Sequence, residues 1–175
     1  MSKYPKVMPH LVVKGGLAAI KFYENAFDAD AEIVTMAEDG KRVLHAELEI
    51  NDGMIMLCDE FPEFSSVTTA PPTAGGASVA IHLELKKPKH VDRIMAQAAE
   101  YGAEIVMPAA DMFWGARYGR VRDPFGHVWS FGAKIKHKQH DTGDLEAEPA
   151  EAIESHAPEV KPVRKSSTRS RTRGV

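Results

Sequence analysis

Aromatic and basic side chains are combined in residues 113–132, and these residue types suit the binding of flat, acidic molecules. Trp114 and Trp129 offer ring surface, and the guanidinium groups of Arg117 and Arg120 can engage acid groups. A simpler interpretation is that the rings pack in the core or at its rim and that the arginines coat the surface, since cores rarely accept an unpaired arginine. The sequence leaves both interpretations open.

Histidines on predicted strands form a second group of candidate residues. His10, His45 and His82 suit hydrogen bonding to an anionic or hydroxylated ligand in the wall of a cleft. Glu47 comes two residues after His45, so both side chains are expected on one face of their strand. The segment 14–16, Lys-Gly-Gly before a helix, would suit a phosphate, although a plain strand-to-helix turn is the commoner explanation.

The aromatic stretch is predicted to be a β-hairpin that turns at residues 123–126. Asp123 can accept hydrogen bonds from the amides of the turn, and Gly126 supplies the positive φ that such turns need. Residues 118–122 and 128–131 on either side have the composition of strands.

The remaining pattern predicts one order of elements twice, namely strand, helix and three strands. Apolar residues recur at helical spacing in 17–27, and residues 42–50 alternate as in a strand. The expected elements are strand 10–13, helix 17–27 and strands 32–36, 42–50 and 54–58, then strand 78–85, helix 89–101 and strands 104–107, 118–122 and 128–131. Residues 59–77, rich in Pro, Ser, Thr and Gly, are predicted to be a linker or lid.

A sequence repeat supports the duplication. The tripeptide at 31–33 recurs at 103–105, an offset of 72 residues (103 − 31), and the same offset places His10 on His82. The predicted fold class is therefore α+β, with two βαβββ modules that form a concave, cleft-bearing mixed sheet.

This pattern resembles the vicinal oxygen chelate superfamily, which contains glyoxalase I, bleomycin resistance proteins and extradiol dioxygenases. The segments that carry the resemblance, and that point to its PhnB-like branch, are residues 8–13, 20–23, 45–48, 59–62 and 122–129. The resemblance covers residues 6–132 and divides them into half one at 6–58, a linker at 59–77 and half two at 78–132.

The resemblance implies a divalent metal held by the first and fourth strands of each half. At the corresponding places, judged by spacing, this chain has Met8, Leu57, Ala80 and Ser130, which departs from the metal pattern at all four. The favoured prediction is a small-molecule-binding protein of the glyoxalase/bleomycin resistance type that needs no metal and has no identified catalytic residue. Its predicted ligand-binding residues are His10, His45, His82, Trp114, Arg117, Arg120 and Trp129.

The alternative is a metal-dependent lyase, isomerase or dioxygenase with a relocated site. His10 and His82 lie two residues further along their strands than the lost positions, so they point to the same sheet face. With Glu47 they would hold zinc, nickel, iron or manganese.

Composition limits the class of protein and of partner. A net charge of −3 argues against a general nucleic-acid binder, and the single Cys58 cannot form an internal disulfide, which favours a reducing compartment. No apolar run approaches the roughly 18 residues of a membrane span. We expect a cytoplasmic homodimer, with a linker long enough to let two copies exchange halves.

Residues 135–175 are predicted to be a disordered, charged tail. Seven acids lie in 141–159 and six bases in 161–173, with too few apolar groups to form a core. Weak contact of the basic part with nucleic acid, or with an acidic partner, is the functional alternative to a solvated tail.

Overall fold

The computed structural model describes residues 5–64 and 69–135, which lie within one compact unit. From residue 136 onward, the predicted charged tail lies outside the described residues.

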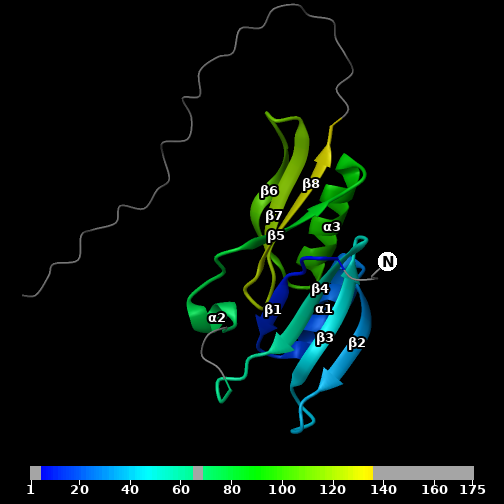
Figure 1. The fold of residues 1–175 in the computed structure, drawn as a ribbon. Coiled ribbons are helices and arrows are strands. Elements are labelled where there is room, and N and C mark those ends of the chain that lie inside the picture. The colour runs from blue at the N-terminus through cyan, green and yellow to red at the C-terminus, as the bar shows by residue number, and fades with distance from the viewer. Residues whose placement is uncertain (1–4, 65–68, 136–175) are drawn as a thin grey trace, which may run out of the picture. The chain divides into compact units, whose positions relative to one another are not determined.

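Two copies of one βαβββ order build this unit (Figure 1). The elements are β1 His10–Val13, α1 Gly16–Phe27, β2 Asp30–Met36, β3 Val43–Ile50 and β4 Gly53–Asp59, then α2 Pro71–Ala74, then β5 Ala80–Glu84, α3 Pro88–Glu100, β6 Glu104–Met112, β7 Ala116–Arg122 and β8 Val128–Lys134. The strands form two four-stranded sheets, in the orders β1-β4-β3-β2 and β5-β8-β7-β6. The first strand runs parallel to the fourth in each sheet, so both sheets are mixed. The predicted fold of two βαβββ modules is confirmed.

Two segments differ from the sequence prediction. Strand β6 continues to Met112, well beyond the predicted residues 104–107. Pro108 and two breaks in the strand register hide this extension from pattern analysis, and Pro108 is tolerated because β6 is an edge strand. The predicted linker contains the short helix α2, which begins at Pro71, a residue type suited to the first turn of a helix.

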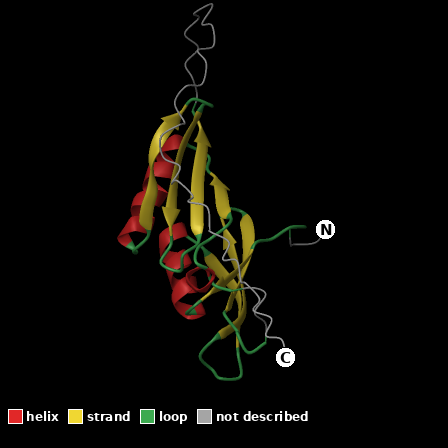
Figure 2. Ribbon diagram, turned by 90° about the vertical axis from the view of Figure 1, so that its left-hand side faces the viewer, coloured by secondary structure: helices red, strands yellow, loops and turns green. Residues whose placement is uncertain are grey.

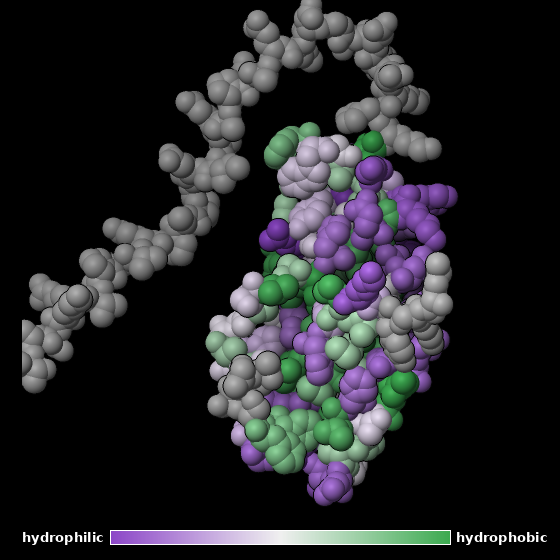
Figure 3. All heavy atoms as spheres, in the orientation of Figure 1, coloured by the Kyte–Doolittle hydropathy of each residue, from purple (hydrophilic) through white to green (hydrophobic). Residues whose placement is uncertain are grey.

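The two long helices cover one side of the sheets, and the other side is left as what we call the open face (Figure 2). Alternate strand residues such as Leu11, Val13 and Phe131 point toward the helices and are buried. Helix α1 joins the two halves, because the ring centroid of Phe27 lies 4.8 Å from the ring centroid of Trp129 in half two. Apolar and hydrophilic residues are interspersed on the surface seen in Figure 3.

A buried carboxylate links the halves at this junction. Asp123 Oδ2 accepts hydrogen bonds from the hydroxyl of Tyr23 at 2.7 Å and from Nε1 of Trp129 at 2.8 Å. Its Oδ1 accepts from the backbone amides of Phe125 and His127, which is the turn geometry that the sequence predicts. Burial, and then the nearby negative charge of Asp123, raise the pKa of Tyr23 well above its ordinary value. Tyr23 therefore remains a hydrogen-bond donor at physiological pH.

Replacing Tyr23 with Phe tests this link, because it removes the hydroxyl that reaches Asp123 from half one. A hydrogen bond to a charged group contributes about 1.5–3 kcal/mol, so we expect the free energy of unfolding to fall by about that amount. Denaturant titration measures the change. The control Tyr101→Phe, at the exposed end of α3, should stay within about 0.5 kcal/mol. Equal losses in the two variants would contradict the assignment.

Candidate ligand-binding site

The open face of half one carries two histidines and a glutamate. His10 on β1 pairs with Met56 on β4, and Met56 pairs with Glu47 on β3, so these three residues form one row across the sheet. His45 Nε2 lies 3.2 Å from Glu47 Oε1, and the ring centroids of His10 and His45 are 6.4 Å apart. The sheet thus brings His10 into the same cluster as His45 and Glu47, which lie 35 or more positions later in the sequence.

The environment of this cluster is unusual for charged groups. Glu47 Oε2 is buried and has no hydrogen-bond partner among the described residues. Burial, and then the neighbouring His45, lower the pKa of His10 from its ordinary value of 6.5. The His10 ring is therefore neutral at pH 7, with one nitrogen able to donate a hydrogen bond and the other able to accept one.

The open face of half two repeats this row with different partners. His82 on β5 pairs with Ser130 on β8, and Ser130 pairs with Arg120 on β7. His82 Nδ1 lies 2.9 Å from Ser130 Oγ, and its Nε2 lies 3.3 Å from a carboxylate oxygen of Glu84. His10 and His82 are thus equivalent positions, as the sequence offset predicts.

Aromatic rings adjoin this second row. Tyr118 stacks on His82 with the ring centroids 6.0 Å apart, and its ring also meets Trp114 edge-on at 5.8 Å. Arg120 Nε donates to the Tyr118 hydroxyl at 2.8 Å, and its guanidinium lies 5.5 Å from the centre of that ring. Tyr118 was not among the residues predicted from the sequence, although its spacing of two residues from Arg120 could have identified it.

Arg120 differs from the other arginines of the described chain. Arg42, Arg93, Arg117 and Arg122 each form an ion pair with a carboxylate, and Arg120 forms none within residues 5–64 and 69–135. Its guanidinium is therefore available to an acidic group from outside the described structure.

Two of the predicted ligand-binding residues, Trp129 and Arg117, already have partners inside the protein. Trp129 is fully buried and packs against α1, so its ring offers no surface to a ligand. Arg117 Nε donates to Asp92 of α3 at 2.7 Å, and its Nη1 donates to Asp111 at 2.8 Å. The Arg117 guanidinium in turn lowers the pKa of Asp92. Both residues are one position away from open-face residues in sequence, which in a strand places them on the opposite side.

The residues present do not fit the metal site that the sequence resemblance implies. Met56 lies beside His10 and Ser130 lies beside His82, so neither fourth strand supplies a carboxylate there. Spacing in the sequence predicts Leu57 at the fourth-strand place of half one, but Leu57 is buried toward the helices. Within the described ranges no three His, Cys, Asp or Glu side chains are grouped to hold an ion, so one chain does not unite His10, Glu47 and His82.

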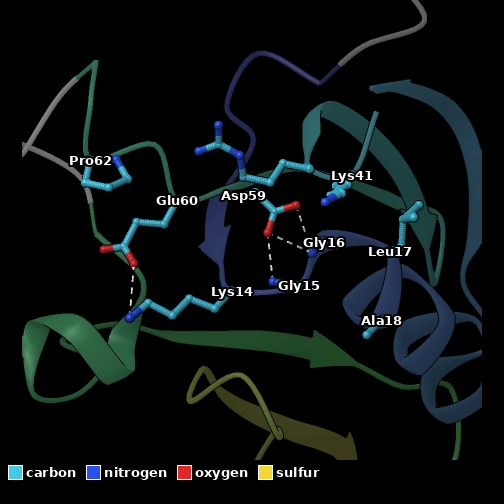
Figure 4. Close-up of a pocket in the computed structure, with 10 residues that line it drawn as sticks. Lys14, Gly15, Gly16, Leu17, Ala18, Lys41, Asp59, Glu60 and Pro62 are labelled. Atoms are coloured by element: carbon cyan, nitrogen blue, oxygen red, sulfur yellow. Dashed lines mark hydrogen bonds and ion pairs between the residues drawn. The ribbon is translucent and has the colours of Figure 1, made fainter. Parts of the chain in front are cut away.

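The helix start at residues 14–16 already has an internal anion (Figure 4). Asp59 accepts hydrogen bonds from the amides of Gly15 at 2.7 Å, Gly16 at 2.9 Å and Val43 at 2.7 Å. Lys14 pairs with Glu60 at 3.5 Å. A cavity of about 620 Å³ lies here, but a phosphate would have to displace the Asp59 carboxylate. This arrangement supports the plain-turn interpretation of the segment.

Known proteins share this architecture. The sequence matches the Glyoxalase/Bleomycin resistance protein/Dioxygenase superfamily over residues 7–131. The chain belongs to this superfamily. An uncharacterised protein of Mycobacterium bovis is 41% identical over 138 residues, which cover 78% of this chain and 88% of that protein.

Solved structures of other proteins share this fold. A gene product of Arabidopsis thaliana is 27% identical with a TM-score of 0.57, covering 73% of this chain and 98% of its own. A PhnB protein from Bacillus cereus is 18% identical with a TM-score of 0.57, covering 74% and 99%, and it shares the fold with this chain. None of the helices in residues 5–64 and 69–135 has the length and apolar character needed to span a membrane.

The lowered pKa of His10 gives a pH-dependent prediction. In an NMR titration we expect the midpoint of His10 below its ordinary value of 6.5, and His45→Gln should raise it only part of the way, because burial is the larger cause. The unfolded chain binds this proton more readily than the folded one. The stability contributed by neutral His10 is thus complete above about pH 6.5 and is lost as the pH falls through the folded-state pKa. A His10 midpoint at or above its ordinary value would contradict this environment.

Proposed function

We propose that this superfamily member binds small organic acids that carry a flat ring, on the open face of half two, and that binding requires no metal. The observation that carries the proposal is Arg120, which has no carboxylate partner among the described residues although the other arginines there are paired. An arginine fork matches a carboxylate or phosphate geometrically and forms strong hydrogen bonds with it.

The neighbours of Arg120 supply the rest of the ligand surface. Tyr118, His82 and the half-exposed Trp114 are in successive ring contacts, and such a series of rings suits a flat molecule. Ser130 holds one His82 nitrogen, which orients the imidazole toward the open face. An acidic group at Arg120 and a ring near Trp114 would engage both kinds of contact.

The absence of carboxylates at the fourth-strand places supports binding without a metal. Met56 and Ser130 lie beside His10 and His82, where the family resemblance implies acidic ligands. A thioether and a hydroxyl are weak ligands for the hard divalent ions. A cytoplasmic homodimer remains our prediction for the working form, since each chain leaves two open faces that a second copy could bring together.

Arg120→Gln is the direct test of this proposal. Calorimetry compares two probes, an aromatic carboxylate or phosphonate and its neutral amide. The variant should bind the acid at least tenfold more weakly than the original protein does, since charged hydrogen bonds contribute about 1.5–3 kcal/mol. The amide should be little affected. Tryptophan quenching by a bound probe should disappear in Trp114→Phe, because Trp129 is buried.

The matched control is Arg93→Gln, which removes an exposed arginine on α3 that is paired with Asp28. We expect it to bind the acidic probe like the original protein. If Arg120→Gln and Arg93→Gln bind the acid equally well, the site has been misplaced.

A metal-dependent lyase, isomerase or dioxygenase is the second candidate. The observation in its favour is the buried, unpartnered Glu47 Oε2 in the cluster with His10 and His45. Because one chain does not bring His82 to this cluster, the relocated site would need His82 from a second copy.

Elemental analysis of the purified protein, with its oligomeric state measured by sedimentation, separates the two candidates. Our proposal predicts substoichiometric metal and no zinc, nickel, iron or manganese affinity in the micromolar range, about −8 kcal/mol. One equivalent of metal in a dimer, lost in His10→Ala, would instead establish the relocated site.

A further inference from the structure

A second hollow lies away from Arg120, between the starts of β1 and β5 and helix α2. We call it the linker hollow, and its volume is about 350 Å³. Val79, which is 71% exposed, and the partly exposed Ile81 supply apolar wall that other described residues do not cover. Ligand sites in proteins typically begin at about 300 Å³, so the hollow is large enough for a small molecule.

The wall formed by the linker is held in place on both sides. Thr73 Oγ1 donates to Glu60 at 2.8 Å, and Glu60 also pairs with Lys14. Pro71 packs so closely on the β7–β8 turn that a Cβ added at Gly126 would lie 2.9 Å from Pro71 Cβ. These contacts form the hollow without a ligand, so binding would require little ordering of the chain.

Two imidazoles border the apolar wall. His127 Nε2 lies 3.1 Å from the carbonyl oxygen of Val12, and because a carbonyl only accepts, this nitrogen carries the hydrogen. In the tautomer with its hydrogen on Nε2, the Nδ1 of His127 is a hydrogen-bond acceptor. His10 also lines the hollow, and its ring nitrogens offer a second site for a hydrogen bond.

The charge and size of the hollow define its ligand. No Lys, Arg, Asp or Glu is among the described residues that line it, so neither an anion nor a cation would find a countercharge. A dry apolar cavity of about 150 Å³ holds one benzene, so this hollow suits one or two rings. We propose that the linker hollow binds an uncharged one- or two-ring molecule bearing a hydroxyl group, with His10 and His127 as its hydrogen-bond partners. This ligand class differs from the acids proposed for Arg120.

Three probes with the same rings test this site on the full chain: 2-naphthol, naphthalene and naphthalene-2-sulfonate. Equilibrium dialysis at pH 7.5 is done with the Arg120→Gln variant, which lacks the acid site of the open face. It should show 2-naphthol binding about tenfold more tightly than naphthalene, and the sulfonate more weakly than both. Amide signals of Val79 and Ile81 should shift with 2-naphthol in a ¹⁵N NMR titration. No binding of 2-naphthol at millimolar concentration, or equal binding of the sulfonate, would overturn the proposal.

Substitutions assign the two imidazoles. His10→Phe keeps a ring but removes both nitrogens, so it should weaken 2-naphthol binding about tenfold and leave naphthalene unchanged. His127→Gln, which retains a donor for the Val12 carbonyl, serves as the second variant and should also weaken 2-naphthol selectively. His90→Phe on α3, outside the hollow, should have no effect. If neither His10→Phe nor His127→Gln alters 2-naphthol binding, the assignment of this ligand to the linker hollow is wrong.

The two proposed sites can fail separately. Arg120→Gln should leave 2-naphthol binding unchanged, and His127→Gln should leave binding of aromatic acids unchanged. Loss of 2-naphthol binding in Arg120→Gln would place the probe on the open face and would overturn the assignment to the linker hollow.

Discussion

The two halves are joined through hydrogen bonds to one buried carboxylate, that of Asp123. It accepts four hydrogen bonds, two from the amides of its own turn and two from Trp129 and from Tyr23 of the other half. A buried carboxylate is costly unless its oxygens are satisfied, so this position tolerates few alternatives. The same group that shapes the β7–β8 turn therefore also fixes α1 against half two.

Asp59 has the corresponding task within half one. Its oxygens accept from the first amides of α1 and from Val43 at the start of β3. The partial positive charge of a helix N-terminus is thereby matched by a residue from the end of β4. Polar groups that could have served a ligand at this point are engaged in holding the helix to its sheet.

The two open faces have kept one feature of the duplicated module and changed another. The equivalent cross-strand rows consist of His10, Met56 and Glu47 in half one and of His82, Ser130 and Arg120 in half two. The histidine is common to both, whereas an acid in one row corresponds to a base in the other. The halves therefore share a fold but differ in charge: the acidic row is partly desolvated, and the basic row lies next to stacked rings.

The sequence by itself determined the order of the elements, the duplication and the turn at Asp123, because strand alternation, helical spacing and turn residues are local properties. It could not determine which side of a strand faces the helices. A shift of one residue moves a side chain to the other side, which is why Trp129 and Arg117 belong to the helix-facing side while Ser130 and Tyr118 belong to the open face. Only the tertiary structure decided that Arg117 finds two carboxylates and that Arg120 finds none among the described residues, because ion pairs join residues from different elements.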